Sequence, residues 1–277
     1  MTDLAVRHLL ETQTVAVRDV ICAGTCRHKS PEECCSATHL VFPYRGVFVR
    51  HVDRNDAVAE ANQVLFFNAG EGYRISHPVE GGDACLSITL REDLLRELAP
   101  QEHLHERDLV AFRRQRLRID PRAQVLAALL RHSFVTRALE PLEGETLTLT
   151  LISRALGERT SHIARGSYGR QKLVDRAKLV LSSELSRRWT LAEIAAEVGA
   201  SPVYLTQTFA RVEGVPLYRY QLRLRLARAL DLLGTCEDLS RLGADLGFSS
   251  HSHFSAAFRQ AFGRTPAEFQ RSVQLRR

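Results

Sequence analysis

No stretch of the 277-residue sequence is apolar for long enough to cross a membrane, and the first residues lack the basic-then-apolar pattern of an export signal. We therefore expect a cytoplasmic chain with no membrane partner. The sequence also has no Cys-x-x-Cys pair, the spacing in which the cysteine ligands of structural zinc sites usually occur. Its six cysteines therefore do not predict a standard zinc site.

Positive charge is unevenly distributed in a chain of otherwise ordinary composition, 44% hydrophobic and 25% charged, which is long enough for two domains. Residues 166–277 contain 17 Lys and Arg against 10 Asp and Glu, whereas residues 1–165 contain 21 against 22. The excess positive charge therefore belongs to the C-terminal part. Such a surplus is expected of a surface that contacts nucleic-acid phosphates.

Two similar segments follow each other in this positive part, Leu191–Gly214 and Leu239–Gly263. Each predicts a short amphipathic helix, a turn that contains glycine, and a second helix. Gly199 and Gly247 follow the last apolar residue of the first helix, where a left-handed residue commonly ends a helix. A further apolar-periodic helix, Leu217–Leu233, joins the two segments. The pattern is that of a tandem helix-turn-helix.

The second helix of each segment has two distinct faces. Ser201 and Ser250 occupy the N-cap positions of these helices. Large apolar residues recur at helical spacing on one face, which we expect to pack inward: Leu205, Phe209, Phe254, Phe258 and Phe262. The opposite face has small and polar side chains, as a helix needs in order to contact base edges in a major groove.

These paired units, together with the ending Gly263–Phe269 of the form Gly-x-x-Pro-x-x-Phe, resemble the DNA-binding domain of the AraC/XylS family of bacterial transcription regulators. The resemblance covers residues 170–277. It implies a sequence-specific regulator rather than an enzyme. Its implied partners are double-stranded DNA, RNA polymerase and a second copy of the chain in a homodimer.

The family pattern also implies which residues contact DNA. The two second helices are expected to enter successive major-groove segments, roughly 34 Å apart. The residues expected to face bases are Val203, Thr206, Gln207, Ser252, His253 and Ala256. The residues expected to contact phosphates are Arg211, Arg259, Arg264 and Thr265. A glutamine can pair bidentately with adenine, and valine can contact a thymine methyl group.

Short apolar and β-branched stretches between Thr14 and Leu90, separated by turn residues, predict a small antiparallel barrel or sandwich. The family resemblance implies a cupin-like β-barrel that binds an effector. Helices are predicted over 91–98, 121–137 and 143–156, with either packing or dimerisation as their role. The chain is thus expected to be α+β with two domains, namely a sensing domain 1–156, a linker 157–169 and an all-α tandem helix-turn-helix domain 170–277.

Histidines do not predict a cupin-type metal enzyme. No His-x-His pair occurs between Thr14 and Leu90. His103 and His105 have this spacing but lie in a charge-rich stretch, and we expect both side chains to be exposed.

Cysteines are concentrated in residues 22–35, which contain Cys22, Cys26, Cys34 and Cys35. A cytosolic protein does not readily keep structural disulfides, so the cluster suggests a metal ion or redox chemistry. The alternative is that some of them are small buried apolar residues. No cofactor is certain, and the effector could be a small organic molecule, a metal ion or an oxidant.

A second functional class remains open at the same cysteines. Cys22-x-x-x-Cys26-Arg27 is similar to the zinc-held cysteine of DNA-repair methyl acceptors, in which it is joined to a similar DNA-binding domain. The second, distant Cys-x-x-Cys pair of those proteins is missing here.

Overall fold

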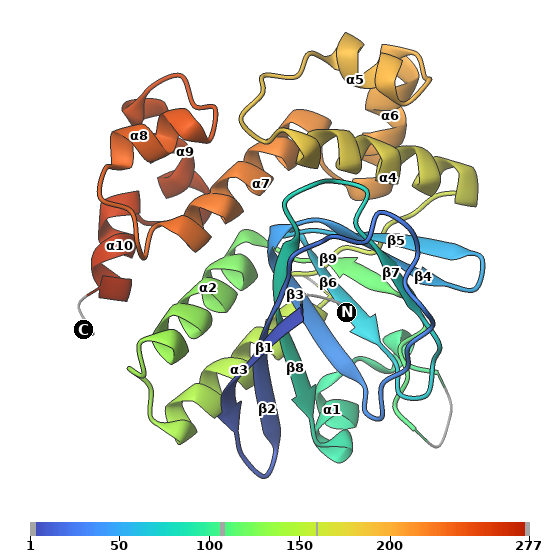
Figure 1. The fold of residues 1–277 in the computed structure, drawn as a ribbon, viewed down its shortest axis with the longest axis vertical. Helices are drawn as coiled ribbons and strands as arrows, with labels where there is room; N and C mark the ends of the chain where they lie inside the picture. Colours follow the sequence, from blue (N-terminus) through green and yellow to red (C-terminus); the bar gives the residue numbers. More distant parts are fainter. Residues whose placement is uncertain (1–3, 106–108, 159, 275–277) are drawn as a thin grey trace. The chain divides into compact units, whose positions relative to one another are not determined.

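The computed structural model describes residues 4–105, 109–158 and 160–274. The chain divides into two compact units, Met1–Ile163 and Ala164–Arg277 (Figure 1). The boundary between them lies within residues 157–169, where the sequence predicts a linker. Each unit has its own buried hydrophobic core.

Antiparallel β-sheet forms much of the N-terminal unit. In the part of the chain that the structure describes, the larger sheet has the strand order β1-β2-β8-β3-β6-β9 and the smaller sheet the order β5-β4-β7. The larger sheet contains β1 (Leu4–Glu11), β2 (Val15–Cys22), β3 (His39–Gly46), β6 (Gln63–Phe67), β8 (Asp83–Leu90) and β9 (Arg116–Arg118). The smaller sheet contains β4 (Phe48–Val52), β5 (Asn55–Ala59) and β7 (Arg74–Ser76). The predicted antiparallel architecture is confirmed.

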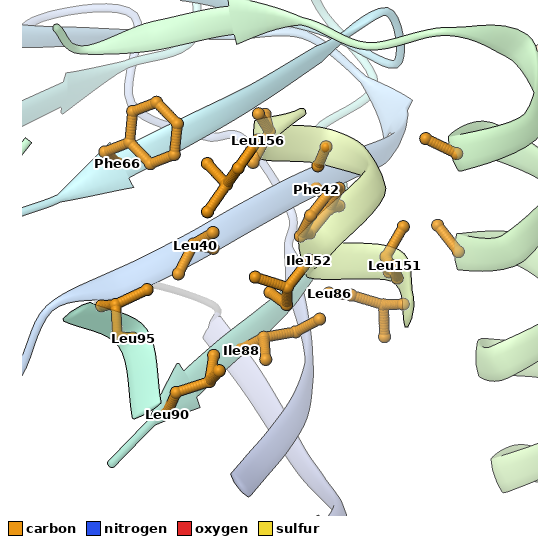
Figure 2. Packing of buried hydrophobic residues seen from close by; sticks show 14 of the residues in the cluster. Leu40, Phe42, Phe66, Leu86, Ile88, Leu90, Leu95, Leu151, Ile152 and Leu156 are labelled. Carbon is orange, nitrogen blue, oxygen red and sulfur yellow. The ribbon is translucent and has the colours of Figure 1, made fainter. Parts of the chain in front are cut away.

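Helices follow the strands and help to close the core of this unit. They are α1 (Glu92–Leu98), the 3-10 helix η1 (Gln101–His103), α2 (Pro121–Val135) and α3 (Pro141–Leu156). Leu151, Ile152 and Leu156 of α3 are fully buried and belong to the same cluster as sheet residues such as Leu40 and Ile88 (Figure 2). Each such side chain contributes about 1.5–3 kcal/mol by leaving water. At least for α3, packing against the sheet is therefore an observed role.

The predicted ends of two helices are shifted by two residues, each for a local reason. Helix α2 ends at Val135 because Arg137 has a left-handed φ of 53°, which does not continue an α-helix. Helix α3 begins at Pro141 rather than Glu143. Proline has no N–H to lose in the first turn, and its fixed φ suits that position.

The prediction that His103 is exposed is wrong. Its side chain is buried, because the backbone around it pairs with the segment that follows: Arg113 N–H donates to His103 O at 2.9 Å and His105 N–H donates to Ala111 O at 2.8 Å. This pairing places Leu104 and His103 in the interior. His105 is exposed, as predicted.

The C-terminal unit is helical throughout its described elements. These are α4 (Tyr168–Ser183), α5 (Leu191–Glu197), α6 (Pro202–Glu213), α7 (Leu217–Leu232), α8 (Leu239–Asp245), α9 (His251–Phe262) and α10 (Pro266–Gln274). Residues of α4, α5, α6 and the first half of α7 share one core, in which Phe209 meets Tyr220 edge-to-face at 5.2 Å between ring centroids. Helices α5–α6 and α8–α9 are the two predicted helix-turn-helix units.

Candidate nucleic-acid interface

Helices α6 and α9 both begin with a serine N-cap and end with a left-handed glycine. The Ser201 hydroxyl accepts a hydrogen bond from Tyr204 N–H at 3.2 Å, and the Ser250 hydroxyl accepts one from His253 N–H at 3.1 Å. Gly214 and Gly263 end the helices with left-handed φ angles of 68° and 76°. The two helices therefore begin and end at equivalent points of the repeat.

The turn glycines Gly199 and Gly247 have the predicted left-handed conformation. Gly199 and Gly247 have φ angles of 65° and 80°, which are readily accessible only to glycine. Their surroundings differ, however. A Cβ at Gly199 would meet no atom within 4 Å, whereas a Cβ at Gly247 would lie 2.2 Å from the carbonyl oxygen of Ser186. In the second helix-turn-helix, the turn therefore requires glycine because of packing as well as conformation.

The apolar and polar faces of both helices separate as predicted. Leu205, Phe209, Phe254 and Phe258 have no measurable exposure. All six residues predicted to face bases are exposed: Val203, Thr206, Gln207, Ser252, His253 and Ala256. Val203 is 66% exposed, so its side chain is free to contact a partner.

Side chains on the exposed faces already make some local hydrogen bonds. The Thr206 hydroxyl donates to Pro202 O at 3.0 Å. His253 Nδ1 is 3.0 Å from the Ser249 hydroxyl, and the imidazole contacts the Phe248 ring edge-on at 5.5 Å between centroids. These contacts restrict the rotamers of Thr206 and His253, so both present a defined surface.

The residues predicted to contact phosphates fall into two groups. Arg211 and Arg259 are exposed in the last turns of α6 and α9. Arg264 and Thr265 are half-buried before α10. The Thr265 hydroxyl accepts from Glu268 N–H at 3.2 Å, and a Glu268 carboxylate oxygen accepts from Thr265 N–H at 2.7 Å. Thr265 therefore also starts α10 with a reciprocal cap.

Arg225 of α7 is a structural residue that sequence reasoning missed. Its guanidinium donates to Leu185 O and Arg187 O, each at 2.7 Å, and to Gly247 O at 3.2 Å. It thereby ties the chain after α4 to the turn of the second helix-turn-helix unit. Burial lowers the pKa of Arg225 from its usual value. The sequence offered no signal for this role, because Arg225 is one of several arginines in α7.

Helix α5, the first helix of the first helix-turn-helix, begins with a capping box at Thr190. The Thr190 hydroxyl accepts from Glu193 N–H at 3.2 Å, while a Glu193 carboxylate oxygen accepts from Thr190 N–H and from the Thr190 hydroxyl, each at 2.7 Å. Hydrogen bonds from Thr190 and then from Arg187 lower the pKa of Glu193 to about 2.

This pKa predicts an acid-sensitive helix start. Because the pKa of Glu193 in the folded protein is depressed, its stabilising contribution is complete above the ordinary glutamate pKa and is lost as the pH falls toward 2. We expect the Glu193 carboxylate carbon to titrate in NMR spectra with a midpoint near 2. In Thr190→Ala, which removes the hydroxyl but keeps the backbone donor, the midpoint should rise. An unchanged midpoint in that variant would contradict the role of the hydroxyl.

The cysteines predicted as a cluster do not come together as a group. Cys35 Sγ lies 3.3 Å from Asn68 O, Cys34 is exposed, and all six cysteines are thiols. Burial raises the pKa of the Cys35 thiol despite the nearby Arg50 guanidinium. Within the described ranges, one set of three metal-ligating side chains lies close together, Cys22, His77 and Asp83. Sequence reasoning singled out Cys22 but not the other two.

Among the helices that the structure describes, none has both the length and the apolar character needed to span a bilayer. Helices α6 and α9 have the same caps and expose polar faces, and their unit has a net positive charge. These features define a helix-turn-helix DNA-binding protein.

Comparison with known proteins agrees with this class. Residues 194–272 match the family model described as a helix-turn-helix domain. The Msm operon regulatory protein of Streptococcus mutans is 25% identical over 115 residues, which cover 41% of each chain. The probable transcriptional regulator LumQ of Photobacterium leiognathi is 27% identical over 241 residues, 85% of this chain and 92% of that protein.

A solved structure is also similar in sequence. It is a transcriptional regulator from Chromobacterium violaceum described by its AraC-type DNA-binding domain, and it is 31% identical over 38% of this chain and 95% of that one, with a TM-score of 0.36. Residues 194–272 therefore form a helix-turn-helix domain similar to that of AraC-type transcriptional regulators.

Proposed function

We propose that the chain recognises a specific DNA sequence by placing α6 and α9 in successive major-groove segments, and that an effector bound in the N-terminal unit controls this recognition. The observation that carries the first part is the duplication itself. Two helices with matching caps expose matching positions, and the apolar faces behind them are buried. Two equivalent reading helices fit the periodic groove of a duplex.

Base recognition in this proposal rests mainly on α6. Gln207 and Val203 are exposed on the same helix, and they suit adenine and a thymine methyl group respectively. In α9, the residues proposed to face bases are Ser252, His253 and Ala256, of which Ala256 has no side chain that can make a hydrogen bond. Helix α9 therefore recognises DNA partly through its shape.

Phosphate contacts orient the protein and supply sequence-independent affinity. Arg211 and Arg259 are exposed in the last turns of the two reading helices, and Arg264 and Thr265 lie beside the start of α10. The exposure of Arg211 and Arg259 in the last turns of both helices supports a role in phosphate binding. Such contacts fix the register of a protein on DNA without choosing the sequence.

The N-terminal unit is the part of the molecule that we assign to effector binding and dimerisation. It folds around its own core, and its sequence lacks the positive surplus of the C-terminal unit. The similarity to the probable regulator LumQ extends over both units. An effector can control DNA binding only if its affinity differs between the DNA-binding and non-binding states. RNA polymerase is the further partner through which such a cytoplasmic regulator would act.

Selection of bound duplexes from a random-sequence pool tests the reading helices. Gln207→Ala should cost roughly 1–3 kcal/mol at one base position and relax the preference there. Gln260→Ala, which removes an exposed glutamine outside the six proposed base-facing positions, should leave the selected sequence unchanged. Arg259→Ala should weaken binding to all sequences alike and lower the salt slope by about 1.

The same selection can contradict the assignment. If Gln207→Ala weakened all sequences equally, Gln207 would be a backbone contact rather than a base contact. If the wild-type chain selected no sequence at all, the proposal of specific recognition would be wrong.

We also propose that the chain is not an enzyme. The alternative, a methyl acceptor for DNA repair, would need a reactive cysteine held by zinc. Incubation of the chain with methylated DNA distinguishes the two, because a repair protein would gain the mass of a methyl group on a cysteine. We expect the mass of the protein to stay unchanged.

A further inference from the structure

We propose that Cys22, His77 and Asp83 form a binding site for one zinc-like divalent ion in the N-terminal unit. Their ligand atoms, a thiol sulfur, a ring nitrogen and a carboxylate oxygen, all lie within 4.8 Å of one another. This site is separate from the DNA-reading helices and goes beyond the proposed recognition of DNA.

The backbone holds the three residues together through long-range pairing. Cys22 ends β2 and Asp83 begins β8, and the two are direct partners in the antiparallel ladder. Directly paired residues of neighbouring strands have their side chains on the same face of the sheet. His77 follows β7, and its N–H donates to Cys26 O at 2.8 Å, which brings the chain after β7 to the chain after β2.

Two glycines allow these segments to approach closely beside the site. Gly24 and Gly82 both have left-handed φ angles, 67° and 66°. A Cβ at Gly24 would lie 2.5 Å from Gly82 Cα, and a Cβ at Gly82 would lie 2.2 Å from Cys22 O. The close approach fixes the positions of Cys22 and Asp83 without the help of any ligand. A preorganised set of ligands loses less entropy when an ion binds.

Burial of the polar atoms also points to a ligand. The side chains of His77 and Asp83 are 4% and 7% exposed, and His77 Nε2 lies 2.6 Å from Asp83 Oδ1. His77 Nδ1 is buried and has no hydrogen-bond partner among the described residues. A buried polar atom without a partner is costly, and an ion coordinated through Nδ1 would offset that cost.

The donor set selects the class of ion. One sulfur, one nitrogen and one oxygen suit zinc and similar borderline metals, whereas magnesium and calcium prefer oxygen ligands alone. In a tetrahedral zinc site the ligand atoms lie roughly 3–4 Å apart, as follows from metal–ligand distances of about 2.0–2.3 Å. The present spacing, up to 4.8 Å, is slightly wider, so the proposal requires the side chains to rotate inward when the ion binds. Cys22 is only half-buried, so water can reach the fourth position.

Cobalt(II) is the probe for the test, because its spectrum reports both thiolate ligation and tetrahedral geometry. Titration of the reduced full chain should give one equivalent of bound cobalt with a thiolate-to-cobalt charge-transfer band. Cys22→Ser should abolish this band, and Asp83→Asn should weaken cobalt binding at least about tenfold. Cys34→Ser, which changes an exposed cysteine in the segment between β2 and β3, should leave the band unchanged.

Zinc-dependent melting separates loss of the site from loss of the fold. Zinc should raise the melting temperature of the wild type and of Cys34→Ser but not that of Cys22→Ser, whose own melting temperature without metal should match the wild type. Retention of the charge-transfer band in Cys22→Ser, or failure of the wild-type chain to bind cobalt, would overturn the proposal. DNA selection by the same preparations is a separate measurement, so its failure would count against the reading helices and not against the metal site.

Discussion

Replacement of Lys178 by alanine should destabilise the C-terminal unit by about 3–5 kcal/mol, because it leaves a buried carboxylate without its counter-charge. Lys178 has no measurable exposure, and its ammonium nitrogen lies 2.7 Å from Glu213 Oε1, which is 1% exposed. Asp175 Oδ1 lies 3.6 Å from the same nitrogen. The pair connects α4 to the last residue of α6, so its loss loosens the first reading helix.

The single tryptophan makes this effect measurable in the full chain. Trp189 lies in the C-terminal unit and packs against its core, so its fluorescence during chemical denaturation reports the unfolding of that unit. The control is Arg241→Ala, which removes an exposed pair with Asp245 and should cost less than about 1 kcal/mol. The double variant Lys178→Met with Glu213→Leu should be more stable than Lys178→Ala, because it removes the Glu213 carboxylate together with its counter-charge. A Lys178→Ala variant as stable as the Arg241→Ala control would contradict this account.

Gly247→Ala should cost about 2–5 kcal/mol and abolish specific DNA binding. Left-handed backbone costs a non-glycine residue about 1–2 kcal/mol, and overpacking against the backbone of Ser186 adds about 1–3 kcal/mol. The segment around Ser186 cannot move freely, because Arg225 binds the flanking carbonyls of Leu185 and Arg187. The turn before α9 must therefore shift, and the second reading helix shifts with it.

The first repeat supplies a matched control. Gly199→Ala changes the equivalent glycine, which has the same conformation but open space around its Cα. It should cost only the conformational part, about 1–2 kcal/mol, and should keep sequence preference. Denaturation followed by Trp189 fluorescence and selection of DNA sequences measure both effects. Equal costs for the two variants would show that Ser186 is not the obstacle.

The features of the C-terminal unit that the sequence predicted correctly are local ones. An N-cap serine, a glycine at the end of a helix and an apolar stripe act through residues close in the chain. Ser201, Gly199 and Phe209 could therefore be assigned without knowledge of the fold. The repeat doubled each of these signals. The exposed faces of α6 and α9 follow from the same periodicity.

The features that escaped prediction depend on pairing between distant segments. Cys22 and Asp83 meet because β2 and β8 pair in one particular register, and a shift of one residue would place their side chains on opposite faces. In the sequence, Arg225 cannot be distinguished from the other arginines of α7. Only the fold brings the carbonyls of Leu185 and Gly247 to its guanidinium. His103 is buried by backbone pairing that its polar neighbours in sequence do not suggest.

The role of Arg225 has a consequence for counterion release on DNA. Each phosphate neutralised by a basic side chain frees condensed cations, and the number freed sets how steeply affinity falls with salt. Arg225 is half-buried and spends its donors on backbone carbonyls, so it is not available to neutralise a phosphate. Counting every arginine of the C-terminal unit as a phosphate contact would therefore overestimate the number of cations that the protein displaces from DNA.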